Sequence, residues 1–357
     1  MSDLNVTQRN HGNDTTTITT NLSFSTFGSQ ETGQSVIDYI NYVFLPATVT
    51  IGITGNILTI IVMKSRQFSA APSSYLLICL AVSDSVLLLI QPLNKSFVMD
   101  VIGQDVRAWH SAICKLYFVI RRTSKVTSSW FVVGLCVERF IAVWFPLKAK
   151  FYMTKRTLVV GILAVYAITF AFTGAFSYAT DVVKGRCQPD VYDREDSFAR
   201  ERFGAMLRAG TVLYSVAPLI ILVTLTPLII GKLIHHNQRR QRMTGSAANN
   251  NKDDGRVTAM LIGIVFAYII LVLPITVLHN AAYELKISAF ASDNAGFDLF
   301  KEISQLLEQL NYALNFFLYV MTSRRFRSVL WEVITCNSFN FQRSKSKSTT
   351  LMSKLSK

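Results

Sequence analysis

The sequence predicts an all-α membrane protein, a bundle of seven transmembrane helices with an amphipathic eighth helix on the inner leaflet. Of the 357 residues, 50% are hydrophobic and only 16% are charged, and the mean hydropathy is +0.33. Soluble domains carry roughly 25% charged residues. The net charge of +14 does not indicate nucleic-acid binding, because the basic residues lie between long apolar runs rather than on one face.

Five of the predicted spans follow from hydropathy alone, since a transmembrane helix needs about 20 mostly apolar residues. Four of these spans contain no charged residue, and the second contains only Asp84. In chain order, the spans are residues 43–63, 75–93, 157–180, 209–231 and 257–278. Polar segments separate them, so each is expected to cross the bilayer once.

Two weaker spans, residues 113–144 and 300–322, complete the count of seven. Both contain charged residues, which are costly inside a bilayer and therefore tend to face the bundle interior and to mark function. The alternative is that these two helices are buried and partly solvated for structural reasons. The charged residues are Lys115, Arg121, Arg122, Lys125, Glu138 and Arg139 in the third span and Lys301, Glu302 and Glu308 in the seventh.

The distribution of polar and basic residues predicts the orientation of the chain. Residues 1–36 are rich in Ser, Thr and Asn and contain N-glycosylation sequons at Asn5, Asn13 and Asn21, which is typical of a disordered extracellular tail. With this tail outside, Lys and Arg are in excess on the inner side, as the positive-inside rule requires. We therefore expect a multi-pass plasma-membrane protein with an extracellular N-terminus and a cytoplasmic C-terminus.

After the seventh span, apolar residues recur at helical spacing beside a cluster of arginines, which predicts an amphipathic helix lying on inner-leaflet lipids. The apolar residues are Phe326, Val329, Leu330, Val333 and Ile334. Cys336 at the end of this helix is either a palmitoylation site or a free cytosolic thiol. The predicted organisation is a disordered tail at 1–36, a membrane domain at 37–335 and a disordered cytoplasmic tail at 336–357.

Short motifs stand at fixed places on the spans. They are Gly55-Asn56 in the first span, Leu80-Ala81-Val82-Ser83-Asp84 in the second, Glu138-Arg139-Phe140 at the end of the third, Pro218 in the fifth, Pro274 in the sixth and Asn315-Phe316-Phe317-Leu318-Tyr319 in the seventh. Each motif alone is weak, but their order and spacing over residues 37–336 resemble the rhodopsin-like G-protein-coupled receptors. Phe140 and Phe316, which depart from the commonest motifs, resemble invertebrate neuropeptide receptors.

The resemblance implies an activation switch on the inner side of the membrane. Arg139, held by Glu138 at rest, would be freed when the sixth helix swings outward and would then meet a heterotrimeric G protein. Further switch positions are Phe140, Tyr268, Pro274 and Tyr319. Val272 stands where the family usually has a tryptophan, so the details of activation are expected to differ.

A disulfide and an ion site are also implied by the resemblance. Cys114 would pair with Cys187 and join the outer end of the third helix to the second outer loop, in an oxidising compartment. The mid-membrane carboxylate of Asp84 would bind an allosteric sodium ion. The polar residues that match the rest of the ion site are Ser124, Ser128, Asn311 and Asn315. The alternative for Asp84 is a protonated carboxyl group hydrogen-bonded in the core, and no other cofactor is expected.

The third span carries an unusual cationic face. Arg121 and Lys125 are four residues apart and therefore share a helix face, which is expected to point into the bundle near its outer mouth, where ligands of the family bind. They could recognise an anionic group of a ligand. Alternatively, they pair internally with Glu308 or Glu302 on the seventh helix, because an unpaired buried charge is costly. Both could hold, with the ligand competing for one partner.

The expected function is a cell-surface receptor for a neuropeptide that signals through a heterotrimeric G protein, with membrane lipids around it and kinases and arrestin acting at the tail. A receptor for a small organic anion or a lipid is the first alternative. A membrane transporter or channel is the second, since intramembrane charges are typical of those proteins too. An enzyme is not expected, because no nucleophile–base or metal constellation appears in the sequence.

Overall fold

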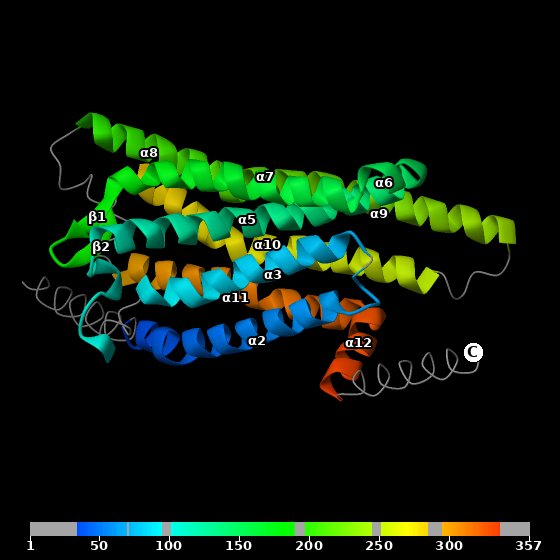
Figure 1. The fold of residues 1–357 in the computed structure, drawn as a ribbon, viewed down its shortest axis with the longest axis horizontal. Helices are drawn as coiled ribbons and strands as arrows, with labels where there is room; N and C mark the ends of the chain where they lie inside the picture. Colours follow the sequence, from blue (N-terminus) through cyan, green and yellow to red (C-terminus); the bar gives the residue numbers. More distant parts are fainter. Residues whose placement is uncertain are drawn as a thin grey trace, which may run out of the picture.

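The computed structural model describes residues 34–69, 71–94, 101–189, 197–244, 251–284 and 295–335. In these residues the chain forms long helices that lie side by side along a common direction (Figure 1). The arrangement confirms the predicted all-α helical bundle. The predicted glycosylation sites Asn5, Asn13 and Asn21 and the predicted lipidation site Cys336 lie outside the described residues.

Each predicted span corresponds to a long helix. The helices are α2 (Leu45–Lys64), α3 (Ser73–Ile90), α5 (Ser111–Trp144), α7 (Lys155–Gly174), α9 (Ala217–Thr244), α10 (Asn251–Glu284) and α11 (Ala295–Thr322). A π-helical turn, η1 (Ile40–Phe44), leads into α2. In the same way, α8 (Ser197–Thr211) and the π-helical turn η5 (Val212–Val216) lead directly into α9, so the fifth predicted span is part of a longer helix.

Shorter elements connect the long helices. They are the 3₁₀ turns η2 (Gln91–Asn94), η3 (Val106–Ala108) and η4 (Ala175–Ala179), the helix α6 (Pro146–Tyr152), the strands β1 (Thr180–Val183) and β2 (Arg186–Pro189), and the helix α12 (Arg324–Ile334). The last of these confirms the predicted amphipathic helix. Phe326 and Val329 on one face of α12 are buried, whereas Trp331 on the other face is 68% exposed.

Among the described residues, five helical segments are long and apolar enough to cross a membrane. They include Ser111–Trp144, because the part of α5 beyond its cationic turn is apolar enough to offset the charges. Where its side chains are described, α10 contains an apolar stretch from Val265 to Leu278. α11, which carries Lys301, Glu302 and Glu308, is not one of the five. These three charged residues make the helix poorly suited to face lipid all round.

α5 lies at the centre of the bundle, where it contacts α3, α7 and α9 (Figure 1). α10 packs between α9 and α11, and α2 packs between α3 and α11. Phe131 of α5, Leu222 of α9 and Val272 of α10 are buried together in the main core. Because α5 touches so many neighbours, polar groups on it can meet partners from most of the other helices.

α2 approaches its neighbours closely at two glycines. A Cβ atom at Gly55 would lie 2.9 Å from the Cβ of Phe316, and one at Gly52 would lie 2.6 Å from Cδ1 of Leu88. Side chains do not pack at such distances, so these positions accept only glycine without movement of a neighbour. The aromatic ring of Phe316 therefore depends on the space that Gly55 leaves.

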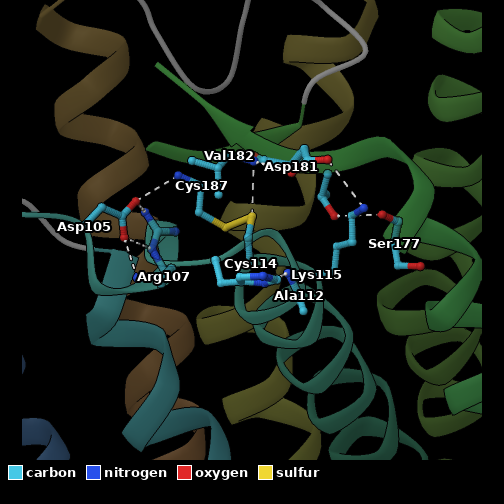
Figure 2. The surroundings of a disulfide bond; sticks show 11 residues. Asp105, Arg107, Ala112, Cys114, Lys115, Ser177, Asp181, Val182 and Cys187 are labelled. Atoms are coloured by element: carbon cyan, nitrogen blue, oxygen red, sulfur yellow. Dashed lines mark hydrogen bonds and ion pairs between the residues drawn. A yellow bond between two sulfur atoms is a disulfide. The ribbon is translucent and has the colours of Figure 1, made fainter. Parts of the chain in front are cut away.

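β1 and β2 form an antiparallel hairpin at one end of the bundle, called here the hairpin end; the opposite end, which carries α12, is called the α12 end (Figure 1). Lys184 and Gly185 at the hairpin tip have φ angles of 52° and 73°, which are left-handed conformations typical of a two-residue turn. Cys187 of β2 forms a disulfide with Cys114 of α5, as Figure 2 shows, and this confirms the predicted bond. Sequence patterning did not indicate the hairpin.

Candidate functional site

A buried ion pair joins α5 to α11. Nζ of Lys125 lies 2.6 Å from Oε1 of Glu308, and the two side chains are only 14% and 1% exposed. The structure therefore contains the internal pairing that was one of the two alternatives for the cationic face. Of the two acids considered for this pairing, Glu308 is the partner of Lys125, while Glu302 lies partly exposed, six residues nearer the hairpin end on α11.

Tyr214 is the third member of this cluster. Its hydroxyl donates a hydrogen bond to the Glu308 carboxylate and lies 3.2 Å from the hydroxyl of Tyr312. Nζ of Lys125 stands 4.4 Å from the centre of the Tyr214 ring, within the range of a cation–π contact. The sequence offered no indication of this role for Tyr214, because an uncharged residue in an apolar span looks like ordinary core.

Two arginines on the same turn of α5 have different surroundings. Arg122 stacks on the ring of Phe176 in η4, with Cζ 4.0 Å from the ring centre, and also approaches Phe118 at 6.0 Å. Arg121 lies one turn from Lys125, and its Nε is buried with no hydrogen-bond acceptor among the described residues. Among the described residues near Glu308, there are therefore more positive groups than this one carboxylate, already paired with Lys125, can neutralise.

Asp84 on α3 also carries a buried carboxylate, and its side chain is fully buried. Ser128 donates to its Oδ1 at 2.5 Å, and Nδ2 of Asn315 donates to its Oδ2 at 2.7 Å. The structure thus brings together three of the five residues of the predicted sodium site. Ser124 and Asn311 stand one helical turn away on α5 and α11, and in the described residues neither donates to Asp84.

At the α12 end, Arg139 lies beside the acid that precedes it. Its Nε is 3.7 Å from Oε2 of Glu138, and one of its terminal nitrogens donates to Oγ of Ser73 on α3 at 3.5 Å. Phe140, the next residue, stacks on Trp144 with the ring centres 5.7 Å apart. The ion pair is partly exposed and loose, as suits a contact that is made and broken.

The other predicted switch residues are spread along the bundle. Tyr319 is buried near the α12 end, with its ring 5.8 Å from that of Phe326. Pro274 lies inside α10. Tyr268, also on α10, donates its hydroxyl to the main-chain carbonyl of Tyr214 at 3.0 Å. One of the switch positions therefore touches the same tyrosine that binds Glu308.

A further polar cluster, which the sequence did not indicate, lies at the hairpin end (Figure 2). The Asp105 carboxylate accepts from Nε of Arg107 at 2.8 Å, from its Nη2 at 2.7 Å and from the backbone N–H of Cys187 at 3.0 Å. Burial alone would raise the pKa of Asp105, but these hydrogen bonds outweigh burial and lower it below its ordinary value. The Arg107 guanidinium also lies over the ring of Tyr117, at 5.0 Å.

An exposed contact stands beside this cluster. The Asp181 carboxylate in β1 lies 3.5 Å from Nζ of Lys115, and both side chains are more than a third exposed. A hydrogen bond from Ser111 and one from the backbone N–H of Val182 lower the pKa of Asp181 below its ordinary value. Together with the disulfide, these contacts tie the hairpin to the first turns of α5.

Similar proteins place this arrangement in a family. The family model described as "7 transmembrane receptor (rhodopsin family)" matches residues 55–319. Growth hormone secretagogue receptor type 1 from Oryctolagus cuniculus is 26% identical over 307 residues, which cover 82% of this chain and 80% of that protein. Neuromedin-U receptor 2 from Rattus norvegicus is 23% identical over 302 residues, which cover 80% and 72%.

The matched region runs from the middle of α2 to the end of α11, so it contains most of the bundle and more than half of the chain. The disulfide, the Asp84 cluster and the Glu138–Arg139 pair all lie within it. The relatives are receptors rather than enzymes. The chain therefore belongs to the rhodopsin family of seven-transmembrane, G-protein-coupled receptors.

Proposed function

We propose that the chain is a cell-surface receptor that binds a neuropeptide and passes the signal to a heterotrimeric G protein. Support comes from the relatives, which are receptors for a growth hormone secretagogue and for neuromedin U. Coupling to a G protein is general to the family. The excess of Lys and Arg on the predicted inner side supports an extracellular N-terminus. The hairpin end would then face the ligand.

The charges around Glu308 are the main support for the proposed ligand site. Arg121 and Lys125 share one face of α5, and the single carboxylate of Glu308 neutralises only one of them. Because Nε of Arg121 is buried without an acceptor in the described part of the chain, an acidic group of the ligand would relieve a real electrostatic cost. A peptide carboxylate or an acidic side chain would approach from the hairpin end, past Glu302.

The same charge balance favours a second candidate within the receptor class. A small organic anion or a lipid would carry a comparable negative group to Arg121. A transporter or channel is set aside, because the chain belongs to a receptor family. A peptide would contact more of the hairpin end than a small anion or a lipid would. Screening both classes of ligand for receptor activation separates the two candidates.

A screen on cells that express the chain with a promiscuous G protein tests the proposal. Neuropeptides form one library, and organic acids and lipids form the other. Arg121→Ala and Glu308→Ala should each shift the concentration–response curve of the activating ligand to concentrations about tenfold higher or more, as expected for losing a hydrogen bond to a charged group. Surface expression should persist. Unchanged potency in both variants would remove the ligand site from these residues, and activation by organic acids alone would favour the second candidate.

We also propose that Asp84 binds an allosteric sodium ion. A fully buried carboxylate beside the Ser128 hydroxyl supplies the oxygen ligands that hard cations prefer. Asn315 already touches Asp84, while Ser124 and Asn311 stand one turn away and could turn their side-chain oxygens toward the ion. The ion would contribute charge balance to a buried acid that is otherwise stabilised by two neutral hydrogen-bond donors.

The α12 end would meet the cytoplasmic partners. Arg139 would be the contact for the G protein once it leaves Glu138, and the exposed Trp331 and the arginines of α12 would lie on inner-leaflet lipids. Kinases and arrestin would act at the Ser/Thr-rich tail, residues 336–357. Each of these partners is expected of a plasma-membrane receptor in this orientation.

A further inference from the structure

Pro218, at the start of α9, has no backbone N–H and therefore cannot donate to either of the two carbonyl groups within its reach in a helix. They belong to Tyr214, four residues earlier, and to Leu213, five residues earlier, in the π-helical turn η5. Nε1 of Trp130 on α5 donates to the Leu213 carbonyl at 3.0 Å. The hydroxyl of Tyr268 on α10 donates to the Tyr214 carbonyl, also at 3.0 Å. Side chains from two other helices therefore hold η5 in place.

Tyr214 is bonded at both of its ends. Its hydroxyl donates to Glu308 on α11, and its ring lies under the ammonium group of Lys125 on α5. Its carbonyl is bonded to Tyr268 on α10. Tyr214 is 8% exposed and Tyr268 is 3% exposed, so water does not compete freely for these groups. One residue thus connects the buried ion pair to the helix that carries the predicted switch.

The contacts around η5 favour a turn that can change its conformation over one that links α5, α9 and α10 rigidly. A turn that lacks the main-chain donor of Pro218 deforms more easily than regular helix, and π-helical turns occur often at functional sites. A second bond crosses the same junction, between the hydroxyls of Ser215 and Thr276, 2.7 Å apart. Val272, buried between these two contacts on α10, has no polar group that could serve instead.

We propose that Tyr214 is the positioning residue through which the Lys125–Glu308 ion pair holds α10 in its resting place. While Glu308 accepts from the Tyr214 hydroxyl, η5 is fixed and its carbonyl is presented to Tyr268. When a ligand separates Lys125 from Glu308, the Glu308 carboxylate moves and no longer accepts from the Tyr214 hydroxyl. The turn η5 then relaxes, and its carbonyl no longer holds Tyr268 and α10. The inference rests on the proposed function for the ligand step, whereas the coupling itself needs neither ligand nor G protein.

The experiment uses the full-length receptor in lipid nanodiscs with spin labels at the α12 ends of α5 and α10. Tyr214→Phe removes the hydroxyl, Tyr268→Phe removes the donor to the carbonyl, and Glu308→Gln removes the charge. Trp130→Phe is the matched control, because it frees the Leu213 carbonyl of the same turn and leaves the hydrogen bond from Tyr268 on α10 in place. If Glu308→Gln cannot be recovered folded with Lys125 left unpaired, the pair Lys125→Met and Glu308→Gln removes both charges together.

The expected result is a population of longer α5–α10 distances that rises on the order of threefold to tenfold in each of the three variants, as for one neutral hydrogen bond. Because the bonds act in series, Tyr214→Phe combined with Glu308→Gln should rise no further than the larger single change. Trp130→Phe should lower the melting temperature but leave the distances unchanged. Multiplying effects in the double variant, or a Trp130→Phe effect equal to that of Tyr268→Phe, would overturn the proposal. If the distances change as expected but no ligand drives nucleotide exchange on a G protein, the result would count against the proposed function alone.

Discussion

The carboxylate of Asp105 accepts a hydrogen bond from the backbone N–H of Cys187 at 3.0 Å, so the loop before α5 is bonded directly to the strand that carries the disulfide. The same carboxylate binds Arg107 through two side-chain nitrogens. Arg107 is only 5% exposed, so its buried positive charge would be costly without the Asp105 carboxylate as a partner. The hairpin is therefore held by a non-covalent tie as well as by the bond to Cys114.

Asp105→Asn should lower the melting temperature of the receptor by roughly 3 to 10 °C, because a charge-assisted hydrogen-bond pair is lost at a buried arginine. The folded-state pKa of Asp105 lies below its ordinary value. Its stabilising effect is therefore complete above about pH 4, the pKa in the unfolded chain, and is lost as the pH falls through the lower folded-state value. Melting curves of both proteins between neutral and acid pH measure the difference.

Asp181→Asn is the matched control for this prediction. Asp181 pairs with Lys115 at the same end of the bundle, but both side chains are more than a third exposed, and such pairs contribute little. The control should melt within about 2 °C of the wild-type receptor, as expected for a surface substitution. Equal losses of melting temperature in Asp105→Asn and Asp181→Asn would show that the buried Asp105 contacts stabilise the receptor no more than the exposed pair does.

Gly55→Ala should destabilise the receptor by about 1 to 3 kcal/mol, the usual cost of overpacking. The added Cβ would lie 2.9 Å from the Cβ of Phe316, and a helix backbone stands behind that atom. Gly134→Ala is the control, since its nearest neighbour would be an ordinary 3.5 Å away on Leu76. Thermal melting in detergent measures the stability of both variants, and equal losses would show that the approach of α2 to Phe316 is not the cause.

Removing one member of the buried ion pair should cost more than removing both charges. Lys125→Met leaves Glu308 charged and fully buried, at a cost of about 3 to 5 kcal/mol. Adding Glu308→Gln to Lys125→Met removes the unpaired buried carboxylate and should restore much of the stability. Melting temperatures of the two single variants and the double variant decide the matter. Additive losses would show that Lys125 and Glu308 do not act as a pair.

Sodium should stabilise the receptor through Asp84. At about ten times its dissociation constant, the ion would add about 1.4 kcal/mol relative to the same concentration of N-methyl-D-glucamine chloride. Asp84→Asn should abolish this difference, and Ser128→Ala should reduce it more than Ser124→Ala, because Ser128 already touches the carboxylate. A sodium effect that survives Asp84→Asn would place the ion elsewhere.

Much of the architecture could be predicted from the sequence, because crossing a bilayer demands long apolar runs whose length and order can be counted. The amphipathic stripe of Phe326 and Val329 predicted α12 in the same way. The disulfide between Cys114 and Cys187 was predicted by resemblance and is present. The hairpin was missed, since Lys184 and Gly185 are a weak turn pair and the strands beside them are short.

The site was predictable only in part. A charge in an apolar span is conspicuous, so Lys125, Glu308 and Asp84 were recognised from the sequence as functional candidates. Tyr214 and Asp105 were not, because their importance comes from partners far away in the chain. Sequence spacing also could not choose between Glu302 and Glu308, which lie six residues apart on one helix.

Hydropathy and helical periodicity are local properties of the chain, so the membrane class, the helices and the charges on them could be read from the residues alone. Three contacts required the folded bundle: Lys125 with Glu308, Tyr214 with both Glu308 and Tyr268, and Asp105 with the disulfide strand. These contacts depend on how the helices rotate and approach one another around α5. That choice is made by packing across the whole bundle, which no single segment encodes.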